Sequence, residues 1–246
     1  MVDPYQESLD DPNMAFEDRW ALIQELDSTN RRLGIYTRFV AEFDRWLDSL
    51  ETEKGTPLSV LDVGSGSGGL CRSLYEYSRS KGREFDFHLY DSQADVLEES
   101  RKLFSPRARV TTHVAPESHL QAYRDQSFDV VISLQVVHHI QPLSAAVSAL
   151  EQMLRVAGKG VFIVDLYNKP LAITGTKVLS HLLGYSKGLA SDGVKSLMRA
   201  HSPDELMKEL QKTPCAQAQE LSLHKYKIYP FWRLESRRTR LSTADL

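Results

Sequence analysis

The sequence is poor in cysteine, and its thiols form no recognisable pattern. Cys71 and Cys215 are the only two cysteines. They are too few for a disulfide framework and for the four-ligand spacing of a structural zinc site. We therefore expect two reduced thiols and no bound metal.

The chain also lacks a long hydrophobic run and a strong net charge. No stretch approaches the roughly 20 apolar residues of a membrane span, and the acidic start lacks the basic and apolar regions of a signal peptide. The formal net charge of −3 disfavours a dedicated nucleic-acid binder, because it provides no field that gathers a polyanion. We expect a cytoplasmic monomer or homodimer that acts on a small molecule, with no nucleic-acid partner.

The hydrophobic pattern, by contrast, is rich and regular. The 246 residues suffice for one α/β domain with appendages. Apolar residues at helical spacing predict two helices within residues 16 to 51, and a polar linker follows. Beyond it, apolar runs predict strands at 58–64, 86–90, 109–114, 128–134 and 161–166, with helices at 70–81, 93–103 and 143–156 between them. This alternation predicts a parallel sheet with helices on both faces.

The last third departs from this alternation. Residues 167 to 201 form an insertion with an apolar segment, and Ser202 with Glu205 is a plausible capping box for the next helix. Residues 218 to 234 predict two more strands. The expected fold is α/β, with a Rossmann-like seven-stranded mixed, mainly parallel sheet. We expect residues 1 to 54 to form a helical lid on a domain at 55 to 246, with a second lid element at 167 to 201.

The most informative segment is DVGSGSGG, which lies between a predicted strand and a predicted helix. Glycines at alternate positions, Gly64, Gly66 and Gly68, let backbone amides approach a ligand at a helix N-terminus. Gly64, Gly66 and Gly69 also match the GxGxxG pattern of dinucleotide sites. Asp62 argues against a dinucleotide, because its carboxylate would repel a pyrophosphate, whereas it would attract the ammonium and sulfonium of S-adenosylmethionine.

This segment resembles the first motif of class I S-adenosylmethionine-dependent methyltransferases, an acidic residue followed by GxGxG. The likeness covers residues 58 to 166 and implies S-adenosylmethionine as cofactor. It also implies that Asp91, at the end of the second strand, accepts the two ribose hydroxyls, although Asp91 could instead serve only as a helix N-cap. Where the family often has an acidic residue near adenine, Glu117 is the candidate. The implied cofactor contacts are Asp62, Gly64, Ser65, Gly66, Gly68, Asp91, Ser92, Glu117, Leu134 and Gln135.

Two adjacent histidines are the catalytic candidates. His138 and His139 follow the fourth strand at the carboxyl edge of the sheet, where ligands bind in such folds. Methyl transfer mainly requires alignment and exclusion of water, and a general base is needed only when the acceptor arrives protonated. An imidazole could take a phenol proton, but either ring could instead cap a turn or pack beside the cofactor.

A narrower likeness concerns the acceptor. The segments DDPNM, ELDSTNRRLGIY, SDGVKSLMRAHSPDEL and YPFWRL are similar to those of bacterial methyltransferases that accompany type III polyketide synthases. This resemblance implies a phenolic or polyketide lipid acceptor. The implied pocket residues are Asn30, Arg31, Tyr36, Tyr167 and Arg199, although Arg31 and Arg199 could equally form surface ion pairs.

The function expected from the sequence is methyl transfer from S-adenosylmethionine to a small hydrophobic or phenolic metabolite, on oxygen. One alternative is an RNA or protein methyltransferase, which would need a positive surface around an open pocket. A reductase that uses a nicotinamide cofactor is another, and Asp62 disfavours it. The third alternative is a non-catalytic module that binds S-adenosylmethionine and a partner protein.

Overall fold

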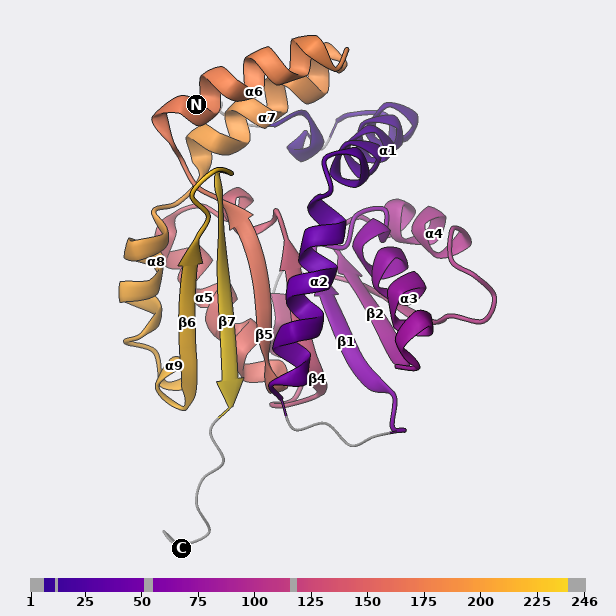
Figure 1. Cartoon of the computed structure of the whole chain (residues 1–246), viewed down its shortest axis with the longest axis vertical. Coiled ribbons are helices and arrows are strands. Elements are labelled where there is room, and N and C mark those ends of the chain that lie inside the picture. The colour runs from indigo at the N-terminus through magenta and orange to yellow at the C-terminus, as the bar shows by residue number, and fades with distance from the viewer. Residues whose placement is uncertain (1–6, 12, 51–54, 116–118, 239–246) are drawn as a thin grey trace, which may run out of the picture.

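The architecture is a seven-stranded sheet with helices on both faces (Figure 1). The computed structural model describes residues 7–11, 13–50, 55–115 and 119–238, so Glu117 lies outside the described residues. The strand order is β3-β2-β1-β4-β5-β7-β6. Strands β1 to β5 pair in parallel, whereas β7 runs antiparallel to β5 and β6. The predicted mixed, mainly parallel sheet is confirmed. The strands are β1 (Leu58–Val63), β2 (Phe85–Asp91), β3 (Arg109–Val114), β4 (Phe128–Leu134), β5 (Ala157–Leu166), β6 (Gln219–Lys225) and β7 (Phe231–Arg238).

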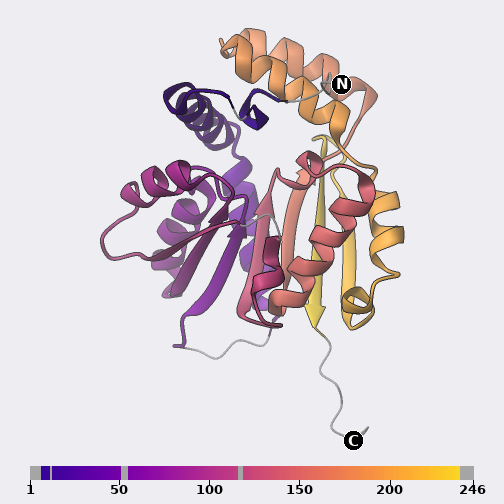
Figure 2. The same ribbon diagram turned by 180° about the vertical axis from the view of Figure 1, so that it is seen from behind.

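Two hydrophobic cores fill the space between the sheet and its helices. One lies under α2 (Ile35–Asp48), α3 (Gly69–Lys81) and α4 (Ala94–Lys102). The other lies under α5 (Leu143–Val156), α8 (Pro203–Leu210) and α9 (Pro214–Gln217), the face seen in Figure 2. Because both faces are covered, the central strands are almost continuously buried, which explains their apolar runs.

Two strands are longer than the sequence pattern predicts. β5 begins at Ala157 rather than at residue 161, and β7 continues to Arg238. Gly160 lies so close to β7 that a Cβ there would be 2.1 Å from the carbonyl oxygen of Ser236. A glycine inside a strand weakens the local strand signal, although here the approach of the neighbouring backbone requires it.

The two N-terminal helices differ in their packing. α2 presents a continuous apolar face to the sheet and belongs to the core layer, whereas α1 (Phe16–Arg32) buries few residues. This differs from the expectation that both helices form a lid. Of the described N-terminal residues, those of α1 and the short 3-10 helix η1 (Ser8–Asp10) stand at the carboxyl edge of the sheet, beside the hairpin of α6 (Pro170–Leu182) and α7 (Lys187–Arg199), as Figure 1 shows.

The cap of α8 and the two cysteines agree with the sequence-based expectations. The hydroxyl of Ser202 accepts a hydrogen bond from the backbone N–H of Glu205 at the start of α8. Cys71 and Cys215 are both free. Within the described ranges, no helix combines the length and apolar character needed to cross a membrane.

Candidate functional site

The carboxyl ends of β1 and β2 open onto a cavity of about 330 Å³, called the glycine cleft below. Gly64, Gly66 and Gly68 all have positive φ angles, of 73°, 49° and 70°. A Cβ at Gly64 would lie 2.4 Å from a methyl carbon of Val136, and one at Gly68 would lie 2.8 Å from the ring of Phe104. Only glycine satisfies both the backbone conformation and the available space.

A buried carboxylate lies beside this loop. Asp62 is 2% exposed, and the thiol of Cys71 donates to its Oδ2 at 3.2 Å. Burial raises the pKa of Asp62 to about 7, the thiol hydrogen bond opposes this rise, and the charge of Asp91 adds to it. A cationic ligand in the cleft would favour the ionised form, so this site fits an ammonium or sulfonium and not a pyrophosphate.

The second acidic residue anchors the loop. The carboxylate of Asp91 accepts the backbone N–H of Gly66 at 2.9 Å and that of Gln93 at 3.1 Å. The N-cap residue of α4 is Gln93 and not Asp91. In the described part of the chain, Ser65 Oγ, Tyr90 Oη and Gln93 Oε1 are buried without a hydrogen-bond partner. These atoms can pair with polar groups of a ligand in the cleft.

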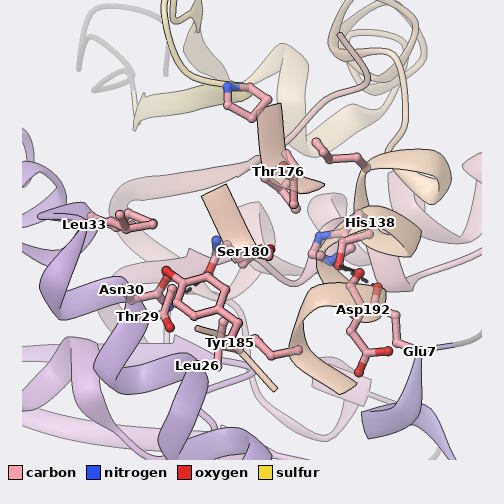
Figure 3. A pocket seen from close by; sticks show the side chains of 18 of the residues that line it. Glu7, Leu26, Thr29, Asn30, Leu33, His138, Thr176, Ser180, Tyr185 and Asp192 are labelled. Carbon is pink, nitrogen blue, oxygen red and sulfur yellow. Dashed lines mark hydrogen bonds and ion pairs between the residues drawn. The ribbon is translucent and has the colours of Figure 1, made fainter. Parts of the chain in front are cut away.

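A second cavity, of about 310 Å³, lies under α1, α6 and α7 and is called the helical cavity (Figure 3). Its lining is mainly apolar, with polar side chains such as Glu7, His138 and Asp192 at one end. It shares a wall with the glycine cleft, formed by Leu9, Leu26, Asn30, Gln135 and His139. In this wall, Asn30 Nδ2 donates to Gln135 Oε1 at 3.0 Å.

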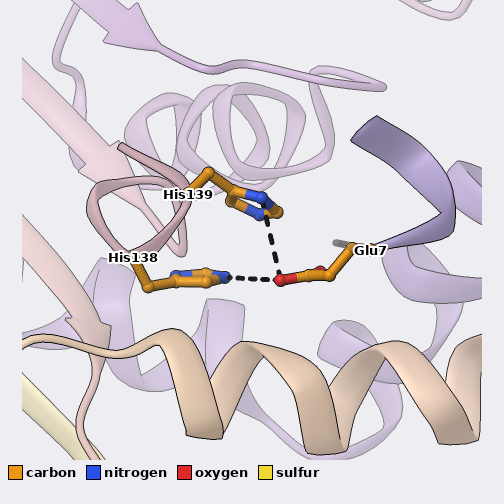
Figure 4. A group of neighbouring side chains, drawn as sticks. All are labelled: Glu7, His138 and His139. Carbon is orange, nitrogen blue, oxygen red and sulfur yellow. Dashed lines mark ion pairs between the residues drawn. The ribbon is translucent and has the colours of Figure 1, made fainter. Parts of the chain in front are cut away.

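Both histidines lie at the polar end of the helical cavity. His138 is 3% exposed, and its Nδ1 lies 2.6 Å from Asp165 Oδ1. Glu7 Oε1 lies 3.6 Å from His138 Nε2 and 3.7 Å from His139 Nδ1 (Figure 4). Asp10 lies 3.1 Å from His139 Nδ1. Glu7, His138 and His139 are called the histidine cluster below.

Asp165 holds the turn that carries these histidines. Its Oδ2 accepts the backbone N–H groups of Val136, Val137 and His138. Burial alone would raise the pKa of Asp165, but the charge and hydrogen bond of His138 hold it below its ordinary value. For Glu7, burial dominates and raises the pKa to about 7, although His139 opposes the rise.

The structure brings most of the expected cofactor contacts together. The residues expected from the sequence that line the glycine cleft are Asp62, Gly64, Ser65, Gly66, Asp91, Ser92, Leu134 and Gln135. Gly68 forms the N-cap of α3 behind them. Tyr36, expected in the acceptor pocket, lines the glycine cleft instead, where its hydroxyl donates to Asp27 at 2.8 Å. Asn30 lines both cavities.

Three expected acceptor contacts line neither cavity. Arg31 is exposed, because it lies about 100° around α1 from the inward-facing Asn30, and its guanidinium stands 5.7 Å from the ring centre of Tyr36. Tyr167 donates its hydroxyl to the carbonyl of Tyr226 at 3.0 Å. Arg199 pairs with Asp10 and donates to the carbonyl of His139.

The sequence pattern did not identify three polar residues, of which Glu7 and Asp192 line the helical cavity and Asp165 lies behind His138. Asp165 ends the fifth strand in IVDL, and an acidic residue at a strand end is a signal that could have been used. Glu7 and Asp192 carry no comparable local signal. Glu7 meets the histidines, and Asp192 lines the same cavity, only because η1 and α7 fold over the same edge of the sheet.

Sequence comparisons agree with this geometry. Residues 61–162 match a family model described as a methyltransferase domain. The chain is 28% identical over 148 residues to malonyl-[acyl-carrier protein] O-methyltransferase of Halorhodospira halophila, a match that covers 59% of this chain and 48% of that protein. It is 27% identical over 189 residues to the non-reducing polyketide synthase atr1 of Stereocaulon alpinum, covering 72% of this chain and 7% of that protein. The chain therefore spans less than half the length of these curated relatives.

Solved structures show the same fold. The plantazolicin methyltransferase BpumL, in complex with SAH, superposes with a TM-score of 0.65 at 15% identity, covering 92% of each chain. Magnesium protoporphyrin IX methyltransferase of Synechocystis PCC 6803, with bound SAH, gives a TM-score of 0.53 at 16% identity and covers 93% of this chain and 90% of its own. With the family match and the glycine cleft, the fold leads to one assignment. Residues 61–162 therefore match a methyltransferase domain, and the chain has the fold of methyltransferases solved with bound SAH, which indicates S-adenosylmethionine as the cofactor of the glycine cleft.

Proposed function

We propose that this chain transfers a methyl group to an oxygen of a small hydrophobic or phenolic metabolite. The observation that carries the proposal is the wall shared by the glycine cleft and the helical cavity, formed in part by Asn30, Gln135 and His139. A donor in the cleft and an acceptor in the cavity would be separated only by this wall. Such proximity is the main requirement of a direct methyl displacement.

The helical cavity favours a small, largely apolar acceptor. Its volume of about 310 Å³ is at the lower end of the range of small-molecule sites. The apolar part of its lining includes Leu22, Leu26, Leu33, Ile35, Leu166, Leu179, Leu189, Leu197, Pro230 and Phe231. Because the acidic side chains Glu7 and Asp192 lie with His138 at one end (Figure 3), an acceptor with an apolar body and a hydroxyl directed at that end matches the cavity.

His138 has the surroundings of a general base for this acceptor. An ionised carboxylate can only accept hydrogen bonds, so the proton shared with Asp165 lies on His138 Nδ1. The lone pair is then on Nε2, on the side of Glu7 and the helical cavity. When bound, S-adenosylmethionine supplies an electrophilic methyl group on a sulfonium. His138 would take the proton that the acceptor oxygen loses as its bond to the methyl carbon forms.

The relatives support an acceptor from natural-product chemistry. They include a carrier-protein O-methyltransferase, a polyketide synthase and a plantazolicin methyltransferase. The likeness to methyltransferases that accompany type III polyketide synthases points the same way. An RNA acceptor is disfavoured, because Glu7, Asp10 and Asp192 give the polar end of the cavity an acidic character.

A transfer assay tests the proposal. The purified chain is incubated with methyl-labelled S-adenosylmethionine and a panel of alkylphenols, alkylresorcinols, small peptides and RNA, and products are identified by mass spectrometry and NMR. We expect label on the oxygen of an apolar phenol, and no label with Asp91→Ala, which removes the anchor of the loop. Label only on RNA or peptide, or on carbon, would contradict the proposed acceptor. Tight cofactor binding without transfer to any acceptor of the panel would favour the non-catalytic module.

A further inference from the structure

The histidine cluster brings together one carboxylate oxygen and two ring nitrogens that could bind a metal ion. The oxygen lies farther from each nitrogen than a hydrogen bond would allow. One ligand atom each from Glu7, His138 and His139 lies within 4.8 Å of the others. Glu7 Oε1 is 3.6 Å from His138 Nε2 and 3.7 Å from His139 Nδ1, whereas N–H···O bonds measure about 2.7 to 3.2 Å. Two ligand atoms of a tetrahedral ion, each about 2.1 Å from the metal, are about 3.4 Å apart. We propose that this cluster binds a divalent transition-metal ion of the zinc type.

The surroundings of His138 match those of a metal-bound histidine. Asp165 Oδ1 accepts a hydrogen bond from His138 Nδ1–H at 2.6 Å, which fixes the ring orientation and leaves the Nε2 lone pair facing Glu7. This carboxylate–histidine arrangement is what supports most histidine ligands in metal sites. An ion bound at His139 Nδ1 replaces the proton that this nitrogen shares with Asp10, and Asp10 keeps its ion pair with Arg199.

An unpartnered buried atom points into the same site. Glu7 is 4% exposed, and within the described residues its Oε1 is buried without a hydrogen-bond partner. A buried carboxyl oxygen that faces two imidazole rings without hydrogen-bonding to either lacks a polar partner, and a cation between the three groups would supply one. Figure 4 shows both rings directed at this oxygen, from the turn after β4, while Glu7 approaches from the opposite side.

The acidic surroundings of the cluster also favour a cation. The carboxyl groups of Asp10, Asp165 and Asp192 lie in or next to it. Within the described residues, Arg199 pairs with Asp10 and Lys195 with Asp192, while Asp165 faces the ring of His138. A cation held by the histidine cluster would be attracted by these neighbouring carboxylates.

The ligand set selects the kind of metal. Two imidazoles and one carboxylate suit zinc and its neighbours, whereas magnesium and calcium prefer oxygen ligands throughout. Three protein ligands with a fourth position open are typical of catalytic zinc sites. All three ligand residues line the helical cavity, so the open position faces the space assigned to the acceptor.

The ion would also have a role in methyl transfer, and this role rests on the proposed function, whereas metal binding itself does not. An acceptor hydroxyl bound at the open position would release its proton to water near neutral pH, because the ion would stabilise the oxyanion, which would then form its bond to the methyl carbon as the bond from that carbon to sulfur breaks. His138 Nε2 then binds the ion instead of taking a proton. The sequence predicted no metal because Glu7 and the histidines are more than half the chain apart, and no spacing rule connects them.

Direct metal titration tests the site without any methyl transfer. The chain is stripped with a chelator and titrated with Zn²⁺, Co²⁺ and Mg²⁺ by calorimetry and absorption, in the absence of S-adenosylmethionine. We expect one equivalent of Zn²⁺ to bind with micromolar or tighter affinity, strong visible bands from tetrahedral Co²⁺, and no binding of Mg²⁺. Glu7→Gln and His138→Gln should weaken Zn²⁺ binding at least tenfold, whereas the exposed controls Glu205→Gln and His224→Gln should leave it unchanged.

Three outcomes would overturn the site: no Zn²⁺ binding by the wild type, equal binding by the Glu7 variant, or only weak bands from octahedral Co²⁺. Circular dichroism checks the folding of each variant, and if one does not fold, the Co²⁺ spectrum of the wild type decides. The transfer assay keeps the two proposals separate. Zinc binding without methyl transfer to any acceptor refutes the proposed function alone, and transfer by a chain that binds no zinc refutes the metal site alone.

Discussion

His138 Nδ1 and Asp165 Oδ1 lie 2.6 Å apart in the interior of the protein, at the carboxyl edge of the sheet. Asp165 also accepts three backbone N–H groups of the turn that carries the histidines. One carboxylate therefore sets both the position of the turn and the tautomer of the ring. Whether Nε2 takes a proton or binds a metal ion, its lone pair depends on this contact.

Replacing Asp165 with asparagine should separate these two effects. The amide oxygen can still accept the backbone N–H groups, which leaves the amide NH₂ to face His138 Nδ1 and moves the ring proton to Nε2. We expect kcat to fall at least tenfold, with little change in the affinity for S-adenosylmethionine. ¹⁵N NMR of the imidazole reports the tautomer directly. Asp129→Asn, at a carboxylate that accepts from the Ser59 backbone, is the matched control, and an unchanged tautomer in Asp165→Asn would refute the argument.

The affinity for S-adenosylmethionine should depend on pH through Asp62. Burial raises the pKa of this carboxyl to about 7, so it is mostly protonated below pH 7 and cannot pair with a cation. As the pH falls from 7 to 5, we expect the Kd to rise about tenfold per unit. Calorimetry across this range measures the effect. In Asp62→Asn the affinity should be weaker and independent of pH, and a flat wild-type profile would contradict the role of this carboxylate.

The same shift predicts how stability changes with pH. The folded state holds a proton on Asp62 up to about pH 7, whereas the unfolded chain releases it near the ordinary aspartate value of about 3.9. The stability that comes from this proton is therefore fully present below about pH 4 and declines as the pH rises from about 4 to about 7, above which it is absent. Thermal melts at several pH values measure this effect. The melting temperature of Asp62→Asn should lack the part of the wild-type decrease that comes from Asp62.

Gly64→Ala should damage the glycine cleft, whereas Gly175→Ala should not. Alanine at residue 64 must adopt a φ near 73°, with its Cβ 2.4 Å from Val136. Overpacking of this kind costs about 1 to 3 kcal/mol, and we expect cofactor binding to weaken at least tenfold. Gly175 lies within α6, and a Cβ there would have no neighbouring atom within 4 Å, so alanine should stabilise the chain by up to about 1 kcal/mol. Denaturant melts and calorimetry compare the two.

Filling the helical cavity should impair acceptor binding alone. Ser180 is buried in α6 and lines the helical cavity, and it does not appear in the wall shared with the glycine cleft. We expect Ser180→Phe to raise the KM for a phenolic acceptor at least tenfold and to leave the Kd for S-adenosylmethionine unchanged. Val178→Phe, at an exposed position of the same helix, is the control. Equal acceptor kinetics in both variants would place the acceptor elsewhere.

Much of the fold and of the cofactor site could be predicted from local sequence. The alternation of apolar runs placed each strand from β1 to β4 within a residue or two, and DVGSGSGG located the turn after β1. Such signals are local, because a strand's burial pattern and a turn's need for glycine depend on neighbouring residues. Asp62 was found because it precedes the glycine motif by two residues, and Asp91 because it ends a strand that the pattern had already located.

The acceptor side was decided by tertiary structure. The orientation of α1 about its own axis places Asn30 in the wall between the cavities and leaves Arg31 exposed. The apolar face of α2 packs that helix against the sheet. Glu7 meets His138 and His139 only because η1 folds back over the carboxyl edge beside α7. The sequence by itself determined the elements and the glycine loop, since these follow from short-range backbone and burial preferences. The chemistry of the helical cavity depends on contacts between distant segments, which only the packing of α1, α6 and α7 over the sheet establishes.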